Sequence, residues 1–103
     1  MDITVEELHQ KLSDKDSFIF IDVREPYEYE EFNLGARLIP MGEIMGKLDD
    51  ISEDINAEIV ICCRSGNRSG MVKSLLTQTG FSNSRNLIGG LVDWQEKFGN
   101  TVP

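Results

Sequence analysis

The chain has 103 residues and a mass of 11.6 kDa, which is enough for one compact domain and too little for two. Its 40% of apolar residues can form one core, and its charged residues are too evenly spread to indicate disorder. Eighteen acidic against ten basic residues give a net charge of -8, which argues against nucleic acid and anionic membranes as partners. So acidic a chain is also expected to repel small anions, unless basic residues gather at one place.

The only two cysteines, Cys62 and Cys63, are neighbours in the chain, and a disulfide between adjacent residues closes a strained ring. The protein is therefore expected to have no structural disulfide and to suit a reducing compartment. The segment 1–9 lacks the features of a signal peptide, and the longest apolar runs, about five residues, are far shorter than a membrane span. We expect a cytoplasmic protein that does not associate with membranes.

Helical patterns and short apolar runs alternate along the chain. Thr4 and Glu7 form a capping box that starts the first helix, and Pro26 suits the first turn of the second. His9 has no partner at metal-ligand spacing and is expected to be structural, and Trp94 is expected to lie in the core. The expected helices are 4–12, 26–32, 41–48, 70–78 and 91–98, and the expected strands are 18–21, 38–39, 59–62 and 86–88.

This alternation predicts an α/β fold, a single domain over residues 1–103 with a mainly parallel central sheet and helices on both faces. In such sheets, sites form outside the carboxyl ends of the strands. The acidic residues of the second helix are expected to form a solvated face: Glu25, Glu28, Glu30 and Glu31.

The junction between the third strand and the helix that follows carries the candidate site residues: Cys63, Arg64, Ser65, Gly66, Asn67, Arg68 and Ser69. Backbone N–H groups in a tight loop and at a helix start form a nest that binds anions and pushes a thiol toward the thiolate. Gly66 lets the backbone turn inward, and Asn67 tolerates a left-handed conformation. With no acid between positions 62 and 73, this loop is expected to be a positive patch that can admit an anion.

Adjacent residues at a strand end point to opposite faces, so only one of the two cysteines can face this loop. Counted from Cys62, Arg68 follows five intervening residues, which is the spacing of cysteine-dependent phosphatases, but the loop glycine then falls one place too late. Counted from Cys63, the glycine falls three residues on. The count favours Cys63 as the nucleophile, with Cys62 packed in the sheet as a small apolar residue.

The loop Cys-Arg-Ser-Gly-Asn-Arg-Ser resembles the active-site loop of the rhodanese (sulfurtransferase) family. Residues 21–25 and 35–40 resemble two further family signatures, and residues 89–94 resemble the closing Gly-Gly-x-x-x-Trp segment. One departure precedes Gly35, where Phe32, Asn33 and Leu34 stand in place of the common Gly-His-Ile-Pro. The frequent histidine of that turn is missing, so no general base is carried over to it.

The resemblance implies that the Cys63 thiolate takes a sulfane sulfur from a donor such as thiosulfate and becomes a persulfide. A thiol or cyanide then accepts the sulfur, and neither a cofactor nor a metal is needed. Arg64 and Arg68 would recruit the anionic donor, and the loop from Arg64 to Ser69 would bind it. Ser65 and Ser69 could donate hydroxyls to the sulfur or cap the helix, and capping is the expected role of Ser69.

Asp22 and Arg24 are expected to form a structural ion pair beneath this loop. Two alternative functions stay open. One is a sulfur-carrier or relay module that serves a protein partner, and the other is a cysteine-dependent phosphatase or arsenate reductase.

Overall fold

A four-stranded parallel sheet forms the centre of the fold in the computed structural model, which describes all 103 residues. The strand order is β2-β1-β3-β4, and every neighbouring pair is parallel. A single parallel bridge between Ile3 and Leu87 continues the sheet beyond β4. The predicted α/β fold is confirmed. The strands are β1 (Ile19–Asp22), β2 (Arg37–Leu38), β3 (Ile59–Cys62) and β4 (Ser84–Asn86).

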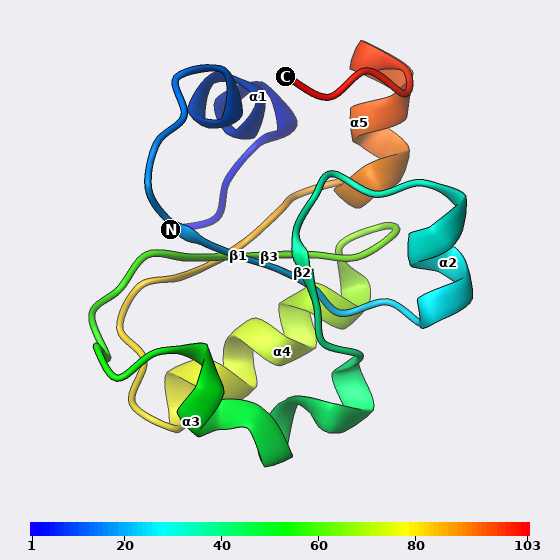
Figure 1. The fold of residues 1–103 in the computed structure, drawn as a ribbon. Coiled ribbons are helices and arrows are strands. Elements are labelled where there is room, and N and C mark those ends of the chain that lie inside the picture. Colours follow the sequence, from blue (N-terminus) through cyan, green and yellow to red (C-terminus); the bar gives the residue numbers. More distant parts are fainter.

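Helices cover both faces of this sheet, with α1 and α5 side by side on one face and α4, η1 and α3 on the other (Figure 1). The helix α2 follows β1 and lies near the carboxyl edge. None of the helices is long and apolar enough to cross a membrane. The helices are α1 (Val5–Ser13), α2 (Pro26–Glu31), the 3-10 helix η1 (Met41–Lys47), α3 (Leu48–Ile51), α4 (Asn67–Gln78) and α5 (Gly90–Phe98).

Strand β3 is buried throughout, and its side chains alternate between two cores. Ile59, Ile61 and Cys63 pack on the α4 side, whereas Val60 and Cys62 pack on the α1 and α5 side. This alternation follows from the two-residue period of a strand. It places the two cysteines on opposite faces, as the sequence predicted.

The first helix begins as its capping pattern predicted, because the Thr4 hydroxyl accepts a hydrogen bond from the Glu7 N–H at 3.1 Å. Its His9 ring stacks on Phe98 of α5, with 4.2 Å between the ring centroids. Trp94, which is fully buried, lies beside the same ring. His9 therefore joins two helices, which is the structural role expected of it, and Trp94 belongs to the core.

Several element boundaries differ from the prediction. The last strand is β4 (Ser84–Asn86) instead of 86–88, because Arg85 can occupy a strand when its guanidinium pairs with Glu58 and Glu7. The first strand begins one residue later than expected, and Ile19 and Phe20 are only half-buried. The segment 41–48 is mostly a 3-10 helix, and α4 begins three residues earlier than expected.

Candidate active site

Cys63 directly follows β3 at the carboxyl edge of the sheet, where the chain turns into α4. Its Sγ accepts hydrogen bonds from the N–H groups of Gly66, at 3.1 Å, and Ser69, at 3.4 Å. The Ser69 Oγ lies 3.3 Å from the same sulfur. Gly66 precedes the helix with φ of +99°, a left-handed conformation that directs the loop N–H groups inward. The structure therefore forms the nest of N–H groups expected from the sequence, and it forms it around Cys63.

The two cysteines differ in acidity. Burial raises the pKa of the Cys63 thiol, but the hydrogen bonds that its sulfur accepts from the N–H groups of Ser69, Gly66 and Ser65 outweigh it. The resulting pKa lies below the ordinary value for cysteine. Burial, followed by the negative charge of Asp22, raises the pKa of Cys62 well above that value. Cys63 is therefore the more acidic thiol of the pair and the one better suited to act as a thiolate nucleophile.

The start of α5 holds the loop from the other side. The N–H groups of Leu91 and Val92 donate to the carbonyl oxygens of Cys63 and Arg64, each at 3.0 Å. These N–H groups belong to the first helical turn and have no partner within the helix. A Cβ atom on Gly90 would lie 2.4 Å from the Arg64 carbonyl oxygen, so glycine permits this approach. The Gly-Gly segment thus allows the start of α5 to hold the backbone of Cys63 and Arg64 in place.

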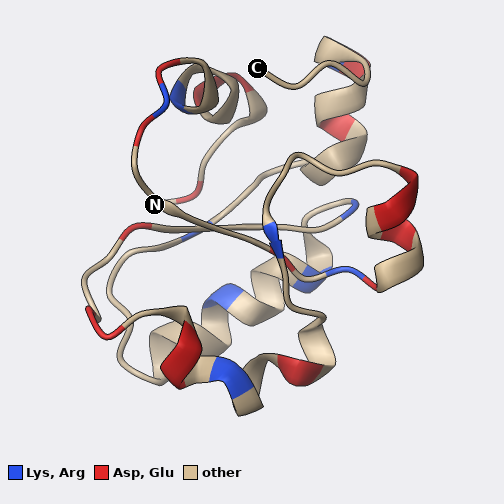
Figure 2. Cartoon of the chain, viewed as in Figure 1, with Lys and Arg blue, Asp and Glu red and all other residues tan.

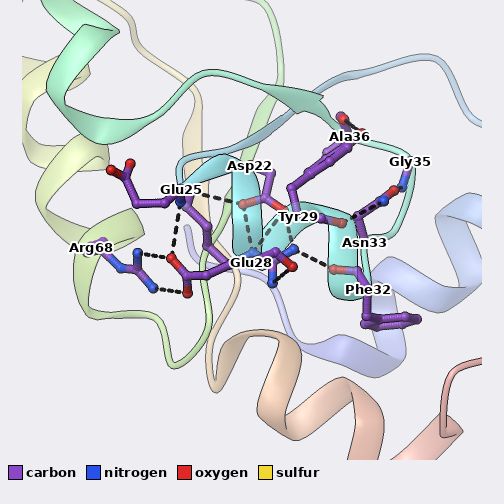
Figure 3. A network of polar contacts seen from close by, with 10 residues as sticks. Asp22, Glu25, Glu28, Tyr29, Phe32, Asn33, Gly35, Ala36 and Arg68 are labelled. Carbon is purple, nitrogen blue, oxygen red and sulfur yellow. Dashed lines mark hydrogen bonds and ion pairs between the residues drawn. The ribbon is translucent and has the colours of Figure 1, made fainter.

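Arg68 forms an ion pair with an acidic residue that the sequence pattern predicted to lie on a solvated helix face. Its two terminal nitrogens donate to both carboxylate oxygens of Glu28 on α2, at 2.7 and 2.8 Å (Figure 3). The side chain of Glu28 is only 15% exposed, so its assignment to a solvated face was wrong. Hydrogen bonds from Arg68 outweigh burial and lower the pKa of Glu28 to about 2. Figure 2 shows the acidic α2 beside the basic loop after β3.

The Glu28 contact also changes the electrostatic expectation for the loop. Arg64 and Arg68 were both predicted to recruit an anion, but the positive charge of Arg68 is balanced within the protein. Arg64 is exposed and forms no ion pair or side-chain hydrogen bond. It lines a cleft of about 380 Å³ beside the loop, together with residues of α2 and α5 that include Tyr27, Glu31, Phe32 and Val92. The free positive charge next to Cys63 is therefore that of Arg64.

The expected ion pair of Asp22 and Arg24 is present and buried, with the Asp22 carboxylate on the Cys62 side of the sheet. Arg24 donates to the Asp22 carboxylate through Nη2 at 2.8 Å and through Nε, and also donates to the Phe32 carbonyl at 2.7 Å. It thereby connects the end of β1 to the end of α2, where Figure 3 shows its two partners, Asp22 and Phe32. The following turn, where the family's histidine is missing, is closed by Asn33, whose Oδ1 accepts from the Gly35 N–H at 2.9 Å.

The conformation or contacts of three loop residues differ from what the sequence predicted. Ser69 was expected to cap α4, but the cap position is Gly66, and Ser69 is a buried residue of the first helical turn. Asn67 was expected to allow a left-handed backbone, but it is the first helical residue, and Gly66 alone in this loop has a positive φ. The exposed Ser65 approaches the sulfur through its N–H, without a hydroxyl contact.

The sequence reading missed Asn86, the last residue of β4. Its Nδ2 donates to the Gly66 carbonyl at 3.1 Å, and its Oδ1 accepts from the Ser69 hydroxyl at 2.6 Å. A polar residue at the carboxyl end of a strand next to β3 is a signal for such a role. The apolar pattern hides that signal, because it predicts Asn86 as the first residue of a strand, whereas Asn86 is the last residue of β4.

Residues 4–97 match the sequence profile of the rhodanese-like domain. The chain belongs to the rhodanese-like domain family. The sequence resemblance identified on four separate motifs is thus confirmed, and it places the chain among the rhodanese-like sulfurtransferases and sulfur carriers.

Relatives of both kinds are similar to it. The putative sulfur carrier protein YrkF of Bacillus subtilis is 36% identical over 93% of this chain, and this chain spans 51% of its length. A sulfurtransferase of Allochromatium vinosum is 34% identical over 90% of this chain and 86% of its own. The thiosulfate sulfurtransferase PspE of Escherichia coli is 33% identical, with 72% and 71% of the two chains covered. The chain thus spans about half of one relative and most of the other two.

The fold has a similarly close match among solved structures. A rhodanese-like domain protein from Staphylococcus aureus superposes with a TM-score of 0.83 at 30% identity. The match covers 100% of this chain and 99% of that one, so the whole architecture is shared.

Proposed function

We propose that this chain transfers a sulfane sulfur from an anionic donor such as thiosulfate to a thiol or cyanide acceptor through a persulfide on Cys63. The observation that carries the proposal is the set of N–H donors directed at the Cys63 sulfur, which favours an anionic sulfur at this position. Similarity to a thiosulfate sulfurtransferase supports thiosulfate as the donor.

In the first step, the Cys63 thiolate uses an electron pair to form a bond with the outer sulfur of thiosulfate. The bond between the two sulfurs of thiosulfate breaks, its electron pair leaves with sulfite, and a persulfide anion remains on Cys63. In the second step, cyanide or a thiolate attacks the terminal sulfur, and Cys63 leaves as the thiolate. Atoms and charge balance in each step without an added oxidant or reductant.

The loop contributes to both steps. The N–H groups of Gly66 and Ser69 that stabilise the thiolate can also stabilise a terminal persulfide anion in the same nest. Arg64 supplies the free positive charge that draws the anionic donor toward the cleft. Cys63 is only 1% exposed, so a slim terminal sulfur can reach it more easily than a bulky phosphate ester.

Mass spectrometry after incubation with thiosulfate tests this proposal. We expect the intact protein to gain the mass of one sulfur atom, the added sulfur to map to Cys63, and cyanide to remove it. A C63A variant should gain nothing, whereas C62A should load normally. An unmodified Cys63 in folded protein, or aryl-phosphate hydrolysis that C62A abolishes, would overturn the proposal.

A sulfur carrier is the second candidate, favoured by the similarity to YrkF. An enzyme and a carrier share the persulfide and differ in how the sulfur leaves. Steady turnover of thiosulfate and cyanide would indicate an enzyme. Stable loading with slow release to small acceptors, and fast release to a protein acceptor, would indicate a carrier.

We also propose a reducing compartment such as the cytoplasm as the place of action. Both cysteines are free thiols, and the chemistry requires Cys63 to remain one. Cell fractionation with thiol labelling before lysis tests this proposal. An oxidised Cys63 in the resting cell would contradict it.

A further inference from the structure

Asn86 contacts the active-site loop through both ends of its side-chain amide. Its Nδ2 donates to the Gly66 carbonyl at 3.1 Å, and its Oδ1 lies 2.6 Å from the Ser69 hydroxyl oxygen. A carbonyl oxygen can only accept hydrogen bonds, so the Gly66 contact requires the nitrogen of the amide on that side. The orientation of Asn86 is therefore fixed, and its oxygen faces Ser69.

The Ser69 hydroxyl has a single hydrogen and two possible acceptors. Its Oγ lies 2.6 Å from Asn86 Oδ1 and 3.3 Å from Cys63 Sγ. Since Oδ1 carries no hydrogen, a contact of 2.6 Å requires the serine hydrogen to lie between the two oxygens. The Ser69 side chain is fully buried. The lone pairs of its oxygen, and not its hydrogen, then face the Cys63 sulfur.

This arrangement suits some states of Cys63 better than others. A neutral thiol can donate its hydrogen to Ser69 Oγ, which completes a chain of hydrogen bonds ending at Asn86. A thiolate needs the hydroxyl hydrogen for itself, and turning that hydrogen toward sulfur leaves two oxygens 2.6 Å apart with no hydrogen between them. In a persulfide, the Cys63 Sγ is uncharged and makes no such demand.

We propose that Asn86 is a positioning residue that holds the Ser69 hydroxyl hydrogen away from the Cys63 sulfur, and so favours the thiol and the persulfide over the thiolate. The persulfide part of this inference rests on the proposed function. Gly66 and Ser69 N–H groups stabilise the thiolate, while the Asn86 and Ser69 side chains oppose it. The balance between them sets how readily Cys63 gives up its sulfur.

Other charged groups around Cys63 do not depend on the Asn86 side chain. Arg68 on α4 is paired with Glu28 on α2, Arg64 is in the loop itself, and Cys62 with the Asp22 carboxylate lies on the other face. Asp2, which pairs with Lys73, accepts from the backbone N–H of Asn86. A substitution at Asn86 retains that backbone contact, so a change in the acidity of Cys63 reports the amide.

A titration of the thiolate by its ultraviolet absorbance tests this inference, with a C63A variant as the blank. We expect N86L to lower the midpoint pH of Cys63 by about 0.5–1 unit, the size of one hydrogen bond to the thiolate. In an S69A background, N86L should cause no shift, because no hydroxyl hydrogen remains to be released. N86A, which adds no atoms, serves if N86L does not fold.

Two results would overturn the inference. A rise of the midpoint in N86L would mean that the amide supports the thiolate. An equal drop with and without the Ser69 hydroxyl would mean that the loop has only loosened, because Asn86 also holds the Gly66 carbonyl.

The persulfide part has its own measurement. At a fixed ratio of thiosulfate to sulfite, the persulfide-to-thiolate equilibrium should fall about three- to tenfold in N86L, which corresponds to the same shift. An unchanged equilibrium would overturn this part. The titration uses no sulfur donor, so it tests the effect of Asn86 on the Cys63 thiol even if the wild-type protein forms no persulfide. The absence of a persulfide in the wild-type protein would refute the proposed function and not this part of the inference.

Discussion

Arg68 and Glu28 lie 40 positions apart in the chain and form two parallel hydrogen bonds, at 2.7 and 2.8 Å. This ion pair ties the start of α4, which follows the Cys63 loop, to α2, which follows β1. Arg24 also holds α2, because its Nη1 donates to the Glu28 backbone carbonyl. The loop is thus held by α2 on one side and by the start of α5 on the other.

The Glu28 to Arg68 pair is expected to stabilise the fold above mildly acidic pH. E28Q should lower the free energy of unfolding at pH 7 by about 1–2 kcal/mol, because it weakens a bidentate, partly buried pair. The folded pKa of about 2 lies below the ordinary 4.5, so the stabilisation is present above about 4.5 and is lost as the pH falls toward 2. Urea unfolding of both proteins across this range measures the difference.

The matched control is E31Q, which removes the same charge from an exposed residue of α2 without an ion-pair partner. It should change the unfolding free energy by less than about 0.5 kcal/mol. An equal loss in both variants, or a loss in E28Q that persists at the lowest pH, would contradict the role given to this pair.

Arg64 is expected to act on capture of the donor. R64Q should raise the KM for thiosulfate about two- to fivefold with a smaller change in kcat, because an exposed charge contributes about 0.5–1 kcal/mol to attraction of an anion. Raising the salt concentration should shrink the difference, since salt screens exposed charges. Steady-state kinetics at two ionic strengths checks both statements.

K15Q is the control, because Lys15 is an exposed residue after α1 and its loss changes the net charge by the same amount. It should leave the KM unchanged. If K15Q and R64Q raised the KM equally, net charge alone would govern capture, and the local role of Arg64 would fail.

Local patterns predicted much of this architecture. The cap at Thr4, the apolar run of β3 and the loop around Gly66 are short-range features, and the structure contains all three. The opposite orientation of the two cysteines follows from the period of a strand, so it could be inferred before any contact was known.

The parts that sequence missed depend on contacts between distant segments. Nothing in the local sequence distinguishes Glu28 from the solvated glutamates of α2, because its partner Arg68 is distant in the chain. The early start of α4 is not visible in the sequence, because the N–H groups of its cap residue, Gly66, and of Ser69 in its first turn donate to the Cys63 sulfur instead of to a capping side chain. Asn86 was misassigned because β4 is stabilised by ion pairs of Arg85, which apolar periodicity does not detect.

The close contact of Gly90 with the Cys63 loop predicts that a side chain at this position destabilises the protein. G90A should destabilise the protein by about 1–3 kcal/mol and slow persulfide formation. Its φ is +59°, and an added Cβ would lie 2.4 Å from the Arg64 carbonyl oxygen and 2.6 Å from that of Cys63. The loop backbone must then move, and the sulfur moves with it. Thermal unfolding and persulfide mass analysis measure the two effects.

G46A provides the comparison, because a Cβ there meets no atom within 4 Å and the backbone φ is not positive. Alanine in this 3-10 segment should leave stability unchanged or raise it by up to about 1 kcal/mol. A G90A protein as stable and as active as G46A would mean that the start of α5 does not hold the loop.

The difference in acidity between the cysteines predicts selective modification. Below pH 9, a small thiol reagent such as methyl methanethiosulfonate should modify Cys63 and leave Cys62 untouched in the folded protein. The pKa of Cys63 lies below its ordinary value because hydrogen bonds outweigh burial, whereas burial and Asp22 raise that of Cys62. The rate at Cys63 should therefore rise with pH and reach its plateau below the ordinary cysteine pKa.

Peptide mapping after quenching at several pH values locates the modification, and denatured protein, in which both thiols react, provides the reference. C62A should retain the rate and pH profile of Cys63, because its side chain packs on the opposite face of the sheet. Modification of Cys62 first, or a Cys63 profile that rises only at the ordinary cysteine pKa, would mean that the loop N–H groups do not stabilise the thiolate. Every step of the proposed sulfur transfer through Cys63 depends on that stabilisation.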